Sequence, residues 1–253
     1  MSENLAVLVT GAAKRLGRAI AQGFGERGWH VIVHYGQSAR EAETLAASLP
    51  SAETYGCDLA DLKSCDRMID QLAGAHPTLQ ALVNCAGIFE ADTAETLDPA
   101  MLLRAIEVNA LAPARLAQRF FARSQAPQRR IIQITDQKIR NTNPDFFSYT
   151  MSKHALHATV GMLAKAHAAP QIAVYGLAPG AVLASHDQSE AEAARSHTRN
   201  LLKRRTTVND IARAAVFLAQ GYLASGQTLY VDGGQHLLNQ LRDVIFLERE
   251  ERE

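Results

Sequence analysis

The chain has 253 residues, of which 47% are hydrophobic, and we expect one α/β domain with a large core. Basic and acidic side chains both number 26, so the formal net charge is zero, which argues against a nucleic-acid partner. The longest apolar runs reach about five to seven residues, and the first strand follows no basic or long apolar segment, so we expect neither export nor membrane insertion.

The cysteines and histidines give no sign of a disulfide framework or a metal site. Cys57, Cys65 and Cys85 are odd in number and lack paired spacing, which suits reduced thiols and a cytoplasmic location. His154 and His157 lie three residues apart on a predicted helix, but no third ligand follows at a useful spacing. We therefore predict no bound metal.

Short β-rich runs alternate with longer helical patterns along the chain. The predicted strands are Leu5–Thr10, His30–Tyr35, Glu53–Gly56, Leu79–Asn84, Arg130–Thr135, Gln171–Ala178 and Gln227–Val231. The predicted helices occupy 15–28, 38–49, 61–74, 98–124, 146–168 and 207–220. Parallel strands need helical crossovers and are buried on both faces, which explains apolar runs such as AVLVT and RIIQIT. The pattern predicts a doubly wound α/β fold, with about seven parallel strands and helices on both faces.

Two segments fall outside this alternation. The segment 181–205 follows a Pro-Gly turn, is polar and alanine-rich, and is long for a connection, so we expect a mobile substrate flap. The tail 236–253 has apolar residues followed by a charge run, which predicts a frayed surface helix or, alternatively, packing against another subunit. No repeat or low-complexity linker divides the chain, so we expect a single domain over residues 1–253.

Three side chains are expected to converge where the strand RIIQITD ends. Tyr149 and Lys153 are four residues apart on a predicted helix, so they share one face, and the ammonium would favour ionisation of the phenol. Asp136 precedes Tyr149 by thirteen residues and ends a strand, and parallel strand ends open onto the ligand crevice. We predict Tyr149 as a proton donor and Asp136 as its partner. The alternative for Asp136 is a helix or loop cap without a catalytic part.

A glycine-containing turn, TGAAKRLG, joins the first strand to the first helix. Such a turn places backbone N–H groups and the positive end of a helix dipole against a diphosphate. Gly11 and Gly17 are present, but Arg15 stands where a third glycine is expected. An arginine brings a guanidinium that can bind phosphate or another anion, whereas the alternative is a solvated side chain at a helix start.

The end of the second strand favours NADPH over NADH. Sites for NADH usually carry an acid there for the ribose hydroxyls, but after HVIVHY no acid occurs until Glu41. A carboxylate would repel the 2′-phosphate of NADPH, so its absence favours that cofactor. The candidate phosphate partners are Ser38, Arg40, Lys14 and Arg15, and the sequence does not choose among them.

The order and spacing of further motifs resemble the short-chain dehydrogenase/reductase family from about residue 5 to Gly234. The motifs are TGAAKRLG, Asp58 in CDL, Asn84 to Gly87 in NCAG, Asn109 in VNALAP, YTMSK, and Pro179-Gly180. The resemblance implies a Rossmann-type fold and a tetramer that pairs through the two long helices at 98–124 and 146–168. Departures from the family pattern include Cys85 for an asparagine and Tyr175 for another asparagine.

The resemblance also assigns roles to individual residues. It implies that Asp58 meets the adenine, that Asn84 to Gly87 line the adenosine ribose, and that Pro179 and Gly180 border the nicotinamide. Asn109 would organise a helix bend and a water near Lys153, and Lys153 would hold the ribose hydroxyls. The predicted cofactor-binding residues are Gly11, Arg15, Leu16, Gly17, Tyr35, Ser38, Asp58, Leu59, Asn84, Ala86, Gly87, Lys153, Pro179 and Gly180.

Three positions resemble the pteridine reductase branch of that family. Most family members have glycine at Arg15 and serine at Asp136, and the aromatic Phe89 follows NCAG by two residues. In this branch the arginine helps to hold the pterin and the cofactor phosphates, and the aromatic ring stacks on the pterin. The predicted substrate residues are therefore Arg15, Phe89, Asp136 and Tyr149. The alternative for Phe89 is a hydrophobic residue that anchors its loop.

The predicted catalytic residues, Asp136, Tyr149, Lys153 and Asn109, favour NADPH-dependent reduction of a C=N bond in a dihydropterin. An ionised Asp136 would repel a carbonyl oxygen but could accept hydrogen bonds from the N–H groups of a pterin. We expect turnover to improve toward mildly acidic pH. The alternatives are a generic NADPH-dependent ketone or 3-oxoacyl reductase and, less favoured, an NADPH-binding protein without turnover.

Overall fold

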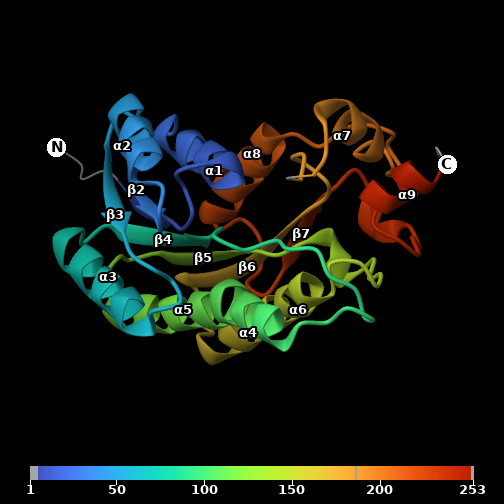
Figure 1. Ribbon diagram of the computed structural model, residues 1–253. Helices are drawn as coiled ribbons and strands as arrows, with labels where there is room; N and C mark the ends of the chain where they lie inside the picture. The colour runs from blue at the N-terminus through green and yellow to red at the C-terminus, as the bar shows by residue number, and fades with distance from the viewer. Residues whose placement is uncertain (1–4, 186, 252–253) are drawn as a thin grey trace.

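Within residues 5–185 and 187–251, which the computed structural model describes, seven parallel strands form one central sheet (Figure 1). The strands stand in the order β3-β2-β1-β4-β5-β6-β7. Their bounds are β1 Ala6–Val9, β2 His30–Tyr35, β3 Ala52–Gly56, β4 Leu79–Asn84, β5 Arg129–Ile134, β6 Ile172–Pro179 and β7 Thr228–Val231. This arrangement confirms the doubly wound, Rossmann-type fold expected from the sequence.

Helices cover both faces of the sheet, so the central strands are buried on both sides (Figure 1). One face carries α1 (Arg15–Gly25), α2 (Ala39–Ser48) and α8 (Val208–Ala219); the other carries α3 (Leu62–Ala75), α4 (Pro99–Ile106), α5 (Ala112–Arg123) and α6 (Phe147–Ala166). Successive strand residues point to opposite faces, so Val7 and Val9 enter one core and Leu8 enters the other. Among the described helices, none combines the length and the apolar character needed to cross a membrane.

The long helix predicted at 98–124 is interrupted in the middle. Between α4 and α5 the chain forms a turn of π-helix, η1 (Glu107–Leu111), which contains the fully buried Asn109. Widened turns of this kind are frequent at functional sites because they redirect side chains out of the regular helical ladder. The irregularity therefore lies at the residue expected to organise a bend.

The described part of the segment 181–205 contains a short helix that sequence analysis missed. Helix α7 (Glu190–Ser196) begins with a capping box, in which Ser189 and Glu192 bond to each other's backbone N–H groups. Such a box satisfies the free donors at a helix N-terminus. Ala193, on the inner side of α7, is fully buried.

The C-terminal segment packs on its own chain. Helix α9 (Val244–Glu250) lies beside α7 at one end of the molecule (Figure 1), and Val244 and Ile245 are buried. The carboxylate of Glu248 forms ion pairs with Arg195 and Arg199, at N–O distances of 2.5 and 2.9 Å. The predicted frayed surface helix is wrong, because this segment buries apolar residues and pairs its charges with the segment 181–205. Residues 252 and 253 lie outside the described part.

Candidate active site

A cavity of about 440 Å³ opens at the carboxyl ends of the central strands. Its lining includes Gly11 after β1, Cys85 after β4, Thr135 after β5 and Gly180 after β6. The winding of the chain reverses between β1 and β4, and ligands of open parallel sheets bind at this point. The predicted site residues that line the cavity are Gly11, Arg15, Leu16, Gly17, Ala86, Gly87, Phe89, Asp136, Tyr149, Lys153, Pro179 and Gly180.

Six predicted residues lie outside this lining, namely Tyr35, Ser38, Asp58, Leu59, Asn84 and Asn109. Asp58 is exposed, and its carboxylate accepts a hydrogen bond of 2.9 Å from the backbone of Ala60. The side chain of Asn84 is buried and donates to Gln133 Oε1 at 2.9 Å, so it faces away from the cavity. The cofactor contacts of these residues stay predictions.

The glycine turn after β1 is packed so closely that side chains would not fit. Gly11 has a φ of 65°, and a Cβ added to it would lie 2.8 Å from Ala86 Cα. A Cβ on Gly17 would lie 2.3 Å from the carbonyl oxygen of Gly11. Only glycine permits the close packing at Gly11 and Gly17, and only glycine adopts the left-handed backbone of Gly11 without strain. The turn thus brings the N-terminus of α1, with its free N–H groups, to the cavity wall, where a diphosphate can be held.

Thr10 and His34, which sequence analysis assigned no role, hold this turn in place. The Thr10 hydroxyl accepts hydrogen bonds from the N–H groups of Cys85 and Ala86, at 2.9 and 3.0 Å. His34 Nδ1 accepts from the Gly11 N–H at 3.1 Å, so its Nε2 donates to the Cys57 carbonyl at 3.2 Å. These polar groups join the ends of neighbouring strands. A polar residue inside an otherwise apolar strand, as in HVIVHY, was the available signal for His34.

Arg15 lines the cavity. Its backbone has a φ of 52°, a left-handed conformation that costs free energy for residues other than glycine. The guanidinium donates to the carbonyl of Ala184 at 2.9 Å, which connects the glycine turn to the flap. Lys14 forms an ion pair of 2.7 Å with Glu41. The acid nearest to the end of β2 is therefore paired with a cation.

Asp136, Tyr149 and Lys153 converge on the cavity, as the sequence predicts. The Tyr149 hydroxyl donates to Asp136 Oδ2 at 2.7 Å, while Oδ1 accepts from the Lys138 N–H at 2.9 Å. The ammonium of Lys153 donates to the carbonyl of Ile134 at 2.7 Å and lies 5.6 Å from the centre of the Tyr149 ring. Asp136 therefore both caps the short turn η2 (Gln137–Ile139) and contacts the phenol.

Burial determines the proton affinities of these groups. Burial raises the pKa of the Asp136 carboxyl above its ordinary value and lowers the pKa of Lys153. Burial and the neighbouring Asp136 charge raise the pKa of Tyr149 well above its ordinary value. The expectation that Lys153 favours a phenolate is wrong for this structure, because its hydrogen bond goes to a backbone carbonyl and desolvation dominates. The Tyr149 phenol is therefore protonated in this structure.

Two stacked phenylalanine rings lie beside Tyr149. The rings of Phe89 and Phe146 stack with 4.2 Å between centroids and 21° between planes. The Phe89 ring also meets Tyr149 edge-on, at 4.7 Å between centroids, and 36% of Phe89 is exposed. Offset stacking and edge contacts of this kind fix ring orientation. A flat ligand could extend the stack on the open side of Phe89.

Asn109 holds the loop that carries Phe89. Its amide oxygen accepts from the Ile88 N–H at 2.9 Å, and its amide nitrogen donates to the Ile88 carbonyl at 3.0 Å. The same nitrogen donates to the hydroxyl of Ser152, on the helix that carries Tyr149 and Lys153, at 2.9 Å. Asn109 thus positions two walls of the cavity relative to each other.

The C-terminal segment closes the far side of the cavity, which sequence analysis did not foresee. Lys138 is 3% exposed, and its ammonium forms an ion pair of 2.8 Å with Asp243. Asp243 caps helix α9, and Asp243, Val244 and Ile245 line the cavity. The loop after Asp136 is therefore fastened directly to the helix that forms this wall.

The fold, the glycine turn and the Tyr149–Lys153 pair define a nucleotide-dependent oxidoreductase of the short-chain type. A family described as enoyl-(acyl carrier protein) reductase matches residues 11–236. The chain therefore belongs to the short-chain dehydrogenase/reductase family.

Known proteins similar to this chain include reductases of pterins, of folates and of ketones. FolM alternative dihydrofolate reductase 1 from Brucella suis, in complex with NADP, is 31% identical with a TM-score of 0.87, and the match covers 94% of this chain and 97% of that chain. Pteridine reductase 1 from Leishmania tarentolae is 29% identical over 91% of this chain and 96% of that protein. The angucycline C-6 ketoreductase LanV with bound NADP is 28% identical with a TM-score of 0.83, covering 92% and 96% of the two chains.

Proposed function

We propose that this protein is an NADPH-dependent reductase that acts on a C=N bond of a dihydropterin, such as dihydrobiopterin or dihydromonapterin, with dihydrofolate as a further candidate. The observation that carries the proposal is the hydrogen bond of 2.7 Å between Tyr149 and the buried carboxyl of Asp136 at the cavity wall. The similarity to FolM and to a pteridine reductase supports the same substrate class.

The residues at the first turn fit NADP(H), the cofactor in the complexes of the similar structures. A Cβ on Gly11 would collide with Ala86, and one on Gly17 with the carbonyl of Gly11, so only glycine allows this tight turn. The turn places the N-terminus of α1 and its N–H groups at the cavity wall, where a diphosphate can be held. Gly11, Leu16 and Gly17 would hold the diphosphate, and Lys153 the nicotinamide ribose. The reduced nicotinamide supplies the hydride when NADPH is bound.

Asp136 and Tyr149 would supply and hold the proton that the reduced ring nitrogen needs. The raised pKa of Tyr149 keeps the phenol protonated, and its hydroxyl lies on the cavity wall. The Asp136 carboxyl, when ionised, accepts from N–H groups and repels a carbonyl oxygen, whereas it donates when protonated. The ionised form favours a nitrogen-rich ring over a simple ketone, and the protonated form can donate to a ring nitrogen.

Phe89 and Arg15 would bind the flat ring and its polar edge. The Phe89 ring is held by Phe146 and Tyr149 but remains 36% exposed, which leaves surface for stacking. The Arg15 guanidinium, on the cavity wall, offers further donors besides the one that Ala184 accepts. Both positions support a planar ligand with hydrogen-bond acceptors.

The second candidate function is reduction of a ketone or 3-oxoacyl group, which the similarity to the ketoreductase LanV favours. The test is NADPH oxidation by the purified protein with dihydrobiopterin, dihydromonapterin and dihydrofolate, beside a panel of ketones and 3-oxoacyl thioesters. We expect a kcat/KM at least about 100-fold higher for a dihydropterin. A preference for ketones would establish the second function. Tight NADPH binding without turnover of any substrate would establish a binding protein.

We also propose a homotetramer in the cytoplasm. Exposed apolar side chains lie on α4, η1 and α6, including Leu103 (63% exposed), Leu111 (46%) and Met162 (68%). Contact between copies would cover such residues. The thiols of Cys57, Cys65 and Cys85 are free, as in a reducing compartment. Light scattering after size-exclusion chromatography measures the assembly, and cell fractionation measures the location.

A further inference from the structure

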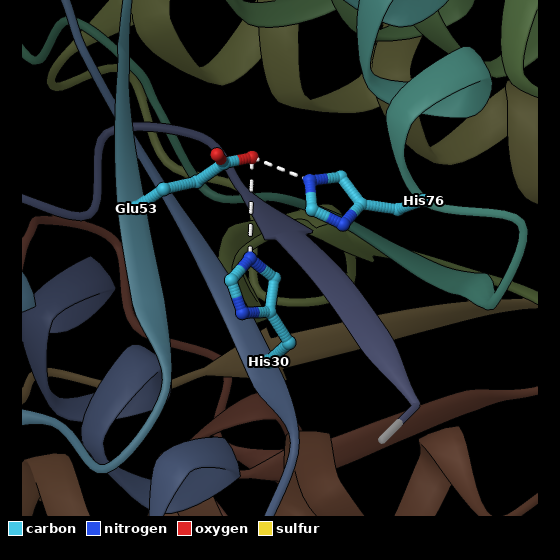
Figure 2. A group of neighbouring side chains, drawn as sticks. All are labelled: His30, Glu53 and His76. Carbon is cyan, nitrogen blue, oxygen red and sulfur yellow. Dashed lines mark hydrogen bonds and ion pairs between the residues drawn. The ribbon is translucent and has the colours of Figure 1, made fainter. Parts of the chain in front are cut away.

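Three potential metal ligands gather at the end of the sheet opposite to the active site. They are His30 at the start of β2, Glu53 on β3, and His76 at the end of α3. Figure 2 shows both imidazole rings directed at the carboxylate of Glu53. No part of the proposed reductase function uses these side chains.

The tertiary fold brings His30, Glu53 and His76 together, because they are far apart in the sequence. Glu53 pairs with Ile32 in the parallel register of β2 and β3, and His30 lies two residues before Ile32, so His30 and Glu53 share one face of the sheet. Helix α3 crosses this face and ends at His76, its C-cap. Each ligand thus comes from a different element, and two of these elements are the edge strand and its neighbour.

The donor atoms are within the range that one small cation can bridge. His76 Nε2 lies 2.6 Å from Glu53 Oε1, and His30 Nε2 lies 3.9 Å from the same oxygen. All three donor atoms lie within 4.8 Å of one another. Tetrahedral zinc with bonds of about 2.0–2.2 Å places neighbouring donors about 3.3 Å apart, so changes of up to about 1.5 Å in the donor separations would complete the site. The side chains are only partly buried, which permits these movements.

His30 points an unpartnered nitrogen into the cluster. Its Nε2 is buried and has no hydrogen-bond partner among the described residues, although 3.9 Å separates it from Glu53. Its other nitrogen, Nδ1, lies 2.8 Å from the hydroxyl of Ser51. When Nδ1–H donates to Ser51, the lone pair of Nε2 faces the centre of the cluster. A metal-bound histidine commonly makes such a hydrogen bond through its second nitrogen.

The charges around the cluster favour a cation. The rings of His30 and His76 stack with 4.7 Å between centroids, so two imidazolium ions would repel each other. Glu53 supplies one negative charge, and the C-terminus of α3, at His76, presents the negative end of a helix dipole. One divalent ion bound by two neutral imidazoles would satisfy all three side chains.

We propose that His30, Glu53 and His76 bind one divalent transition-metal ion, Zn²⁺ in the first instance. Two imidazole nitrogens and one carboxylate oxygen are donors that zinc accepts in tetrahedral sites, with the fourth position open to solvent. The ion would fasten the edge strand β3 to β2 and to the end of α3. Because the cluster lies at the other end of the sheet from Asp136 and Tyr149, its role is structural.

The test is calorimetric titration of the chelator-treated, full-length protein with zinc chloride. We expect one equivalent per chain, and binding at least about tenfold weaker in each of the variants His30→Gln, Glu53→Gln and His76→Gln. The matched control is His167→Gln, which removes a histidine outside the cluster and should bind as the unchanged protein does. Circular dichroism of each variant confirms that it is folded.

Two further readouts separate this site from binding elsewhere. Zinc should raise Tm in the unchanged protein and in the control but not in the three variants. Cobalt(II) in place of zinc should give visible absorption bands that the three variants lose. Absence of zinc binding, or an isotherm that all three variants retain, would overturn the proposal. In either case the cluster is a hydrogen-bonded pair, His76 and Glu53, beside an unmetallated His30.

Discussion

The hydroxyl of Tyr149 donates to Asp136 Oδ2 across 2.7 Å, within a buried pair whose two pKa values are both raised. A serine at position 136 could share a hydrogen bond with the phenol but could not change its charge in response to pH. The carboxyl couples the proton affinity of Tyr149 to its own ionisation.

The activity of the enzyme should rise as the pH falls. Because burial raises the pKa of Asp136, this carboxyl takes up its proton at a higher pH than a surface aspartate does. The protonated pair is therefore populated in mildly acidic solution, and kcat/KM for a dihydropterin should increase from about pH 7.5 to about pH 5. The variant Asp136→Asn, which has no group to titrate, is the control and should show a flatter profile. A flat profile in the unchanged protein would contradict the prediction.

Replacement of Asp136 by serine should separate catalysis from capping. Serine caps a turn well, so Asp136→Ser can retain the bond that Oδ1 accepts from the Lys138 N–H at 2.9 Å. It removes the carboxyl beside Tyr149, and we expect kcat/KM for the dihydropterin to fall by about 10²- to 10⁴-fold. The Kd of NADPH, measured by fluorescence titration, should stay within about threefold. If activity and NADPH binding are lost together, Asp136 has only a structural role.

Arg15 should improve substrate binding and lower the free energy of unfolding. Its φ of 52° is costly for any residue with a side chain, whereas glycine adopts it readily. Arg15→Gly and Arg15→Ala both lose the guanidinium, so both should raise KM for the pterin by about tenfold. Only Arg15→Gly relieves the backbone, and its free energy of unfolding should exceed that of Arg15→Ala by roughly 1 kcal/mol. Urea denaturation measures this difference, and an unchanged KM in both variants would exclude a substrate contact.

The open side of Phe89 should stack on the substrate ring. Phe89→Ala should raise KM for a dihydropterin by about tenfold, which is the loss expected for one aromatic stacking contact, with little change in NADPH affinity. Phe89→Leu separates stacking from loop anchoring, because leucine restores the apolar volume against Phe146 but not the ring. Recovery of normal KM in Phe89→Leu would favour the anchoring role.

The elements that were predicted correctly have sequence patterns contained within a few neighbouring residues. The strand HVIVHY is predicted with the same bounds that β2 has, because its apolar run is bounded by a glycine and a turn. The glycine turn and the spacing of Tyr149 and Lys153 are also local, and the structure brings these residues to one cavity. Regular secondary structure and short-range spacing can thus be predicted from the sequence alone.

The features that were missed depend on contacts between distant segments. Helices α7 and α9 are short, and their stability comes from packing on each other and from ion pairs such as Arg195–Glu248. The direction of the Tyr149 pKa shift was predicted wrongly, because spacing reveals a nearby lysine but not the burial that outweighs it. The cluster of His30, Glu53 and His76 likewise follows from strand register and helix length.

The buried ion pair of Lys138 and Asp243, at 2.8 Å, fastens the active-site loop to α9. Lys138→Met leaves the Asp243 carboxylate largely buried without its cation, which should cost about 3–5 kcal/mol of unfolding free energy in urea. The double variant Lys138→Met/Asp243→Asn removes both charges and keeps an N-cap for α9, so it should be more stable than Lys138→Met alone. Because Val244 and Ile245 line the cavity, the single variant should also lower kcat/KM for the pterin more than the double variant does. A double variant less stable than Lys138→Met would show that Asp243 stabilises α9 independently of Lys138.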